Sequence, residues 1–145
     1  MANHSYWRIY ITANNGASLL SIPEVEFRAT VGGSDQASGG TAVYGTQNPN
    51  GNPDNLAAAA FDNDTGTKWT SNSNVPDYLG YHFASAVDVK EVSILGPTAG
   101  NGPTYAPKDF SIDYSDDGST WTTVKGFTNE TGWGAIEQRL FNLAL

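Results

Sequence analysis

Hydrophobic and polar residues alternate along most of the chain, which is the pattern of half-buried β-strands. Turn signals rich in Gly, Asn, Asp and Pro separate the alternating segments. Many short strands joined by turns predict an all-β sandwich, built as a single domain over residues 1–145. The expected strands cover residues 6–11, 21–28, 43–44, 78–83, 87–95, 109–114, 120–124 and 137–143.

Two segments depart from this alternation. Residues 53–61, PDNLAAAAF, predict one or two helical turns capped by Asp54. Residues 96–107 hold three Gly and three Pro, which predicts a long irregular loop of the kind that carries function or disorder. Three tryptophans in the alternating segments are expected in the core: Trp7, Trp69 and Trp121.

Composition and charge narrow the classes of partner. Charged residues make up only 15% of the chain, which suits strands and turns better than helices. The net charge of −8 repels nucleic acid and anionic lipid and favours cations, so no nucleic-acid partner is expected. No run approaches about 18 apolar residues, and no basic segment followed by an apolar one opens the chain. The sequence therefore predicts neither membrane insertion nor a secretory signal.

An oxygen-rich stretch, AFDNDTGTKW, occupies residues 60–69 between two large aromatic side chains. Calcium takes about six to eight oxygen ligands, and Asp62, Asp64 and Thr67 can supply several of them. An EF-hand is excluded, because its twelfth position, counted from Asp62, is Ser73 rather than Glu. An Asx-turn loop without metal explains the same residues, since Asp and Asn satisfy turns by themselves.

Three motifs, AFDNDTGTKW, YLGYHF and PKDFSIDYSDDGSTWTTV, follow one another in an order and spacing that resemble the discoidin family, also called the coagulation-factor C-type domain. The resemblance runs from about Thr41 to Leu143. It implies a jelly-roll β-sandwich of the galactose-binding-like type. The first thirty residues look like the opening of versions found in bacteriophage tail and prophage proteins. They also resemble a Glu-containing strand pair that the family usually has at its C-terminal end, so we expect a pair moved to the N-terminus to complete the sheet.

The resemblance also implies one structural calcium ion in the oxygen-rich loop. Matched position by position, its ligands would come from the Ala59 carbonyl, Asp62, Asp64 and Thr67. A residue that enters the last strand would complete the shell, and Glu137 fits that description. The ion would then tie the start of the sandwich to its end.

Sugar sites in such sandwiches lie in loops at one end and combine an aromatic face with a few polar groups. Trp133, between two Gly in ETGWGA, is the main candidate for an exposed stacking ring. The galactose-binding relatives use a His and an Arg in these loops, and residues 96–105 contain no Arg, so galactose specificity is not supported. The expected ligand-binding residues are Trp133, Tyr105, Tyr44, Asn72 and Asn101.

Motifs for catalysis are missing from the sequence. The chain has no Cys, no Gly-x-Ser-x-Gly and no His-Glu-x-x-His, so it is expected not to be an enzyme. The function expected is a carbohydrate-binding module that recognises a cell-surface glycan, as part of a phage or phage-like particle. The alternative is a structural or assembly domain of a virion, which contacts protein. A virion or extracellular location and a homo-oligomer suit both, because repetition strengthens weak sugar binding.

Overall fold

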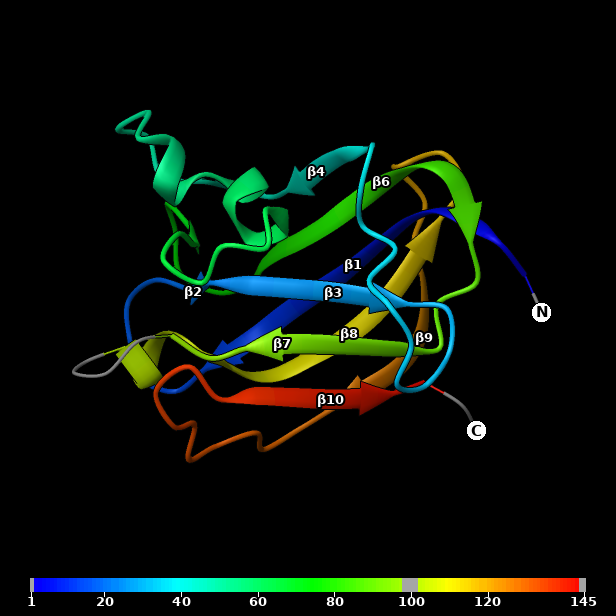
Figure 1. Cartoon of the computed structure of the whole chain (residues 1–145). Helices are drawn as coiled ribbons and strands as arrows, with labels where there is room; N and C mark the ends of the chain where they lie inside the picture. The colour runs from blue at the N-terminus through cyan, green and yellow to red at the C-terminus, as the bar shows by residue number, and fades with distance from the viewer. Residues whose placement is uncertain (1, 98–101, 144–145) are drawn as a thin grey trace.

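The structure is a computed structural model that describes residues 2–97 and 102–143. Two antiparallel sheets lie face to face, as Figure 1 shows. One sheet has the strand order β4-β6-β1-β8-β9, the second β10-β7-β3, and a small pair joins β2 to β5. The expectation of an all-β sandwich is confirmed. In chain order the strands are β1 (His4–Asn14), β2 (Ser21–Ile22), β3 (Glu24–Arg28), β4 (Thr41–Tyr44), β5 (Trp69–Thr70), β6 (Asp77–Val87), β7 (Glu91–Leu95), β8 (Pro107–Ser115), β9 (Thr122–Phe127) and β10 (Gln138–Asn142).

The N-terminal strand β1 lies in the centre of the larger sheet. Its Ile9 is opposite Leu79 of β6 on one side and Ile112 of β8 on the other. Residues 7, 9 and 11 face the second sheet and are buried, whereas Arg8 and Tyr10 face outward. Strand β3 adds an edge to the smaller sheet. The first thirty residues therefore contribute to both sheets, but not as the strand pair that the resemblance implied, because β1 and β3 belong to different sheets.

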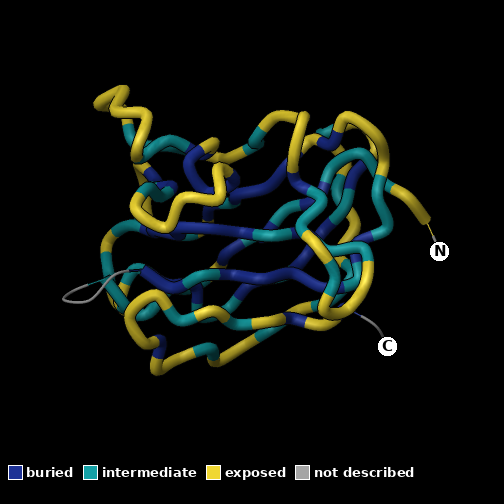
Figure 2. Tube along the Cα trace, in the orientation of Figure 1, coloured by how far each residue is buried: buried dark blue, intermediate teal, exposed yellow. Residues whose placement is uncertain are grey.

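The core fills the space between the two sheets, where Figure 2 shows the buried segments. Trp7 and Trp69 belong to it, with 2% and 0% of their surfaces exposed. The prediction for Trp121 is wrong. Its ring lies on the outer face of the larger sheet, 4.1 Å from the Arg8 guanidinium, because that cation is held there by Asp113 at 2.9 Å.

Element boundaries differ from the expected ones at several places. The segment expected as one strand over residues 21–28 is divided, because β2 ends at Ile22 and β3 begins at Glu24 in another sheet. The segment expected as one strand over residues 87–95 is split, because β6 ends at Val87 and β7 begins at Glu91. The helical stretch consists of two 3-10 segments, η1 (Pro53–Asn55) and η2 (Ala57–Phe61). Asn52, not Asp54, caps the first, since its side-chain oxygen accepts from the Asp54 N–H at 3.1 Å. A third 3-10 segment is η3 (Gly102–Tyr105). In the described part of the chain, none of the helical segments has the length and hydrophobicity of a membrane-spanning helix.

Candidate functional site

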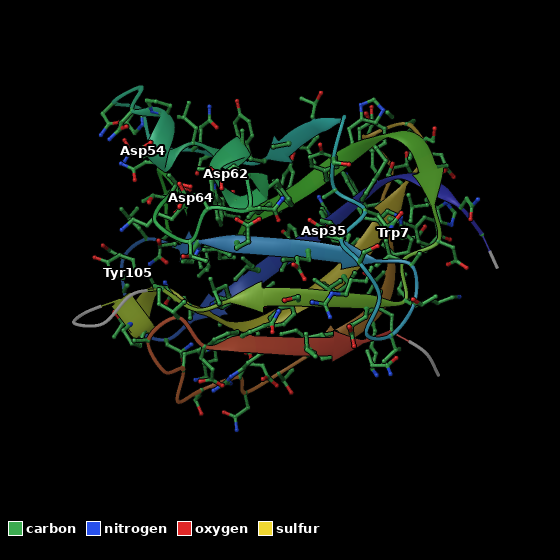
Figure 3. The ribbon with its side chains drawn as sticks, in the orientation of Figure 1. Trp7, Asp35, Asp54, Asp62, Asp64 and Tyr105 are labelled. Atoms are coloured by element: carbon green, nitrogen blue, oxygen red, sulfur yellow. The ribbon has the colours of Figure 1, made fainter. Side chains whose placement is uncertain are left out.

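The loop after η2 is held at both ends by buried aromatic side chains, Phe61 and Trp69. Between them, Asp62 and Asp64 form successive Asx turns, and Figure 3 shows both side chains on this loop. Asp62 Oδ1 accepts from the Asp64 N–H at 2.9 Å, and Asp64 Oδ1 accepts from the Gly66 N–H at 2.8 Å. One oxygen of each carboxylate is therefore used by the turn itself.

The remaining oxygens of the loop converge on the hydroxyl of Thr67. Its Oγ1 lies 2.6 Å from Asp62 Oδ2, 3.1 Å from the Asp64 carbonyl oxygen and 3.3 Å from the Ala59 carbonyl oxygen. A hydroxyl has one hydrogen to donate, so it cannot satisfy three acceptors at once. Four oxygens gathered around one proton form the kind of environment that a hard cation prefers.

Glu24, at the start of β3, brings a third carboxylate to this loop. Its side chain is buried, and its Oε1 accepts from the Asn63 N–H at 3.2 Å. Its Oε2 is buried without a hydrogen-bond partner among the described residues. Burial, reinforced by the nearby charge of Asp62, raises the pKa of Glu24 to about 8. A buried carboxylate oxygen without a partner is costly unless a proton or a cation accompanies it.

A cleft of about 330 Å³ opens beside the loop, a volume within the range of small-molecule sites. One wall is the β2-β5 pair, in which Ser21 is opposite Thr70. The other wall is η3, whose Tyr105 is labelled at this end of the molecule in Figure 3. The described residues that line the cleft are Leu19, Ser21, Lys68, Thr70, Pro97, Gly102 and Tyr105.

The β2 wall carries a polar atom that the fold does not use. Ser21 is 5% exposed, and its Oγ has no hydrogen-bond partner among the described residues. The neighbouring backbone is firmly held, because the Leu20 N–H donates to Ser71 Oγ at 2.9 Å and the Ser71 N–H donates to the Leu20 carbonyl at 3.0 Å. The wall of the cleft therefore contains a fixed hydroxyl without a described partner, buried beneath the surface.

The comparisons with known proteins place this architecture in a family. The family model of the F5/8 type C domain matches residues 41–143, which is well over half of the chain. The chain belongs to the F5/8 type C domain family. Proteins of this family are generally non-catalytic modules that bind carbohydrates or other ligands. A search of curated proteins and a search of solved structures each find no match.

In this F5/8 type C domain, one predicted calcium ligand is misplaced. Glu137 lies far from the Asp62 loop in the fold. Its carboxylate accepts from the Gly134 N–H at 2.6 Å and from Arg139 Nε at 2.8 Å, and the hydrogen bond from Arg139 lowers the pKa of Glu137. The cause is the sheet order: β3 and β10 are opposite edges of the smaller sheet, and η2 contacts β3. Glu24, in β3, is therefore the glutamate whose side chain reaches the Asp62 loop.

The oxygen set of the domain fits a calcium ion. It combines the carboxylates of Asp62 and Glu24, the Thr67 hydroxyl and the carbonyls of Ala59 and Asp64. Within the described ranges, no group of three or more His, Cys, Asp or Glu side chains gathers at one point. That finding suits this set, which relies on carbonyl and hydroxyl oxygens for most of its members. The Glu in the N-terminal strand pair was the sequence feature that could have identified Glu24.

The prediction of an exposed stacking ring at Trp133 is wrong. Its side chain is 4% exposed, and Nε1 donates to the carbonyls of Pro107 at 3.1 Å and Glu130 at 3.0 Å. The Arg139 guanidinium lies 4.3 Å from the ring centroid and covers one face. Trp133 fills the end of the sandwich because both hydrogen-bond partners of its indole lie inside the fold.

The other expected ligand-binding residues are dispersed. Tyr105 lines the cleft. Tyr44 is 39% exposed at the end of β4 and does not line it. Asn72 is exposed, donates its N–H to Thr46 Oγ1 at 2.9 Å and is likewise outside the lining. Asn101 lies outside the described residues. Sequence reasoning missed Ser21, Lys68 and Thr70, which come together only through the pairing of β2 with β5.

Proposed function

We propose that this F5/8 type C domain is a non-catalytic, calcium-stabilised module that binds a glycan in the cleft between β2, β5 and η3. The observation that carries the proposal is a cleft lined by Tyr105 together with the polar residues Lys68 and Thr70. Sugar sites combine an apolar ring face with a few fixed polar groups in this way.

The calcium ion would stabilise the cleft by fixing the β2-β5 pair that forms one of its walls. Thr67 directly precedes Lys68, and Glu24 follows Ser21 by three residues, so both strands of the β2-β5 wall lie close in sequence to a proposed ligand. When bound, the ion supplies positive charge that compensates the carboxylates of Asp62 and Glu24. Its ligands would then link the loop after η2 to β3 and hold the β2-β5 pair in place.

Binding to a glycan array, followed by titration with the best glycan, tests the proposal. Tyr105→Ala removes the aromatic surface of the cleft and should weaken binding by about three- to tenfold. Tyr44→Ala is the matched control, because that tyrosine is exposed outside the cleft and its loss should leave affinity unchanged. Equal affinity of the wild-type protein and Tyr105→Ala would show that the sugar binds outside this cleft.

The setting that we propose is a virion or an extracellular surface, and it rests on the resemblance of the first thirty residues to phage-tail versions. Several copies in one particle would raise the avidity of a weak sugar site. Native mass spectrometry of the purified protein, combined with the glycan array, distinguishes multivalent glycan binding from an assembly role. A defined oligomer that binds no glycan would favour assembly.

A further inference from the structure

The cleft differs from the rest of this acidic molecule in the sign of its charge. The chain carries 15 Asp and Glu against 7 Lys and Arg. Yet the charged side chain that lines the cleft is Lys68, and its other described lining residues are neutral. A ligand that binds beside a cation must be electrostatically complementary to it.

The ammonium of Lys68 is not used by the fold. Four other basic residues pair with carboxylates: Arg8 with Asp113, Arg28 with Glu91, Lys90 with Asp88 and Arg139 with Glu137. Lys125 donates instead to the Asn142 carbonyl at 3.0 Å. Among the described residues, Lys68, Lys108 and Lys125 have no carboxylate within ion-pair distance, and of these three Lys68 lines the cleft.

The cleft also offers hydroxyl donors next to this cation. The Ser21 hydroxyl is buried and unpaired, and Thr70 is directly opposite Ser21 in the β2-β5 pair. An ammonium and hydroxyls together provide charge-assisted hydrogen bonds to an anion, which are stronger than bonds to a neutral group. A neutral sugar would use the hydroxyls and leave the Lys68 charge without a partner.

We infer that the cleft selects an anionic sugar, whose carboxylate or sulfate is bound by Lys68. This inference rests on the proposed function, because it names the class of glycan that the same cleft binds. The carboxylate and sulfate share one chemistry, a single negative charge with oxygen acceptors, and the experiment distinguishes them.

The test is an array of matched glycan pairs at a fixed free calcium concentration. Each pair holds an acidic glycan and its neutral counterpart: a uronic-acid oligosaccharide with its carboxyl-reduced form, and a sulfated oligosaccharide with its desulfated form. Preferred pairs are then titrated with the wild-type protein, Lys68→Gln, Lys68→Arg and Lys125→Gln. The last variant makes the same change in net charge at a lysine whose Nζ bonds a backbone carbonyl outside the cleft.

The expected result is preference for the acidic member of a pair, with the carboxylated and sulfated pairs showing which anion is bound. Lys68→Gln should weaken acidic binding about tenfold and leave neutral binding unchanged, while Lys68→Arg and Lys125→Gln keep the preference. Equal binding of both members overturns the inference and leaves the proposed function standing. A preference that survives Lys68→Gln also overturns it. Binding to no glycan on the array overturns the proposed function and the inference with it.

Discussion

Two regions of the molecule carry the residues that sequence reasoning selected, and they differ in how far the fold itself satisfies them. Around Trp133, the indole N–H donates to the Pro107 carbonyl, and the Glu137 carboxylate accepts from the Gly134 N–H and from Arg139. Around Asp62, the Thr67 hydroxyl faces three acceptors and Glu24 keeps one oxygen without a described partner. The polar groups of the first region have partners within the chain, whereas the second has more acceptors than donors, which is why we propose a cation there. A structural region and a candidate site therefore differ in whether their polar groups have hydrogen-bond partners within the chain. This criterion distinguishes them better than residue type does.

Replacement of Trp133 tests the structural side of this comparison and should have the largest effect. Trp133→Ala removes a buried ring and two hydrogen bonds, so the free energy of unfolding should fall by about 3–5 kcal/mol. Urea denaturation followed by tryptophan fluorescence and circular dichroism measures it. Tyr105→Ala, at the partly exposed wall of the cleft, should cost less than about 1 kcal/mol. Unchanged stability of the Trp133→Ala protein would show that the Trp133 region does not depend on the packing of this ring.

Calcium binding tests the Asp62 region of the comparison. At a free concentration one hundred times its dissociation constant, an ion that binds only the folded state stabilises the protein by about 2.7 kcal/mol. For a chain of this size the melting temperature should rise by about 5–10 °C relative to protein with a chelator. Differential scanning calorimetry gives the shift, and elemental analysis identifies any ion retained through purification. Identical melting curves and no retained calcium would leave the loop as a set of Asx turns.

Glu24 and Glu137 sharpen the comparison to single residues. Glu24→Gln removes a proposed ligand charge and should abolish most of the calcium-dependent rise, about 2 kcal/mol or more. Glu137→Gln makes the same chemical change at the opposite edge of the smaller sheet and should retain the rise in full. Isothermal titration with calcium measures both. Loss of calcium binding in Glu137→Gln alone would restore the ligand set first expected from the sequence.

The sequence predicted the fold more completely than the site, and the residues show why. Alternation in β1 placed Trp7 in the core correctly, since a strand covered on one face by a second sheet must bury alternate residues. It misassigned Trp121, because alternation does not say which face is covered. The Asp62 loop could be predicted because its oxygens lie within a few residues of one another. Ser21 and Lys68 could not, because their neighbours are set by the β2-β5 pair. Glu24 had a signal in the N-terminal strand pair, but its contact with the loop depends on the order of β10, β7 and β3.

The pH dependence of the calcium-free protein provides the smallest and most specific test of Glu24. Its folded-state pKa of about 8 lies above its ordinary value of 4.5, because burial disfavours the charged form. The proton held by the folded state therefore adds stability below about pH 4.5, and this stability is lost as the pH rises through about 8. Asp62, Asp35 and Glu26 act in the same direction as burial. Asp117, whose pKa is lowered to about 2, titrates below this window.

The measurement is urea denaturation in chelator between pH 5 and pH 9, for the wild-type protein and Glu24→Gln. The wild-type protein should lose stability with rising pH relative to the variant, since the amide has no proton to release. With saturating calcium this loss should disappear, because the ion binds the deprotonated carboxylate and Glu24 then carries no proton in either the folded or the unfolded state above about pH 5. A wild-type curve parallel to that of Glu24→Gln in chelator would mean that Glu24 is already charged and compensated within the chain. The contrast with Glu137 would then disappear.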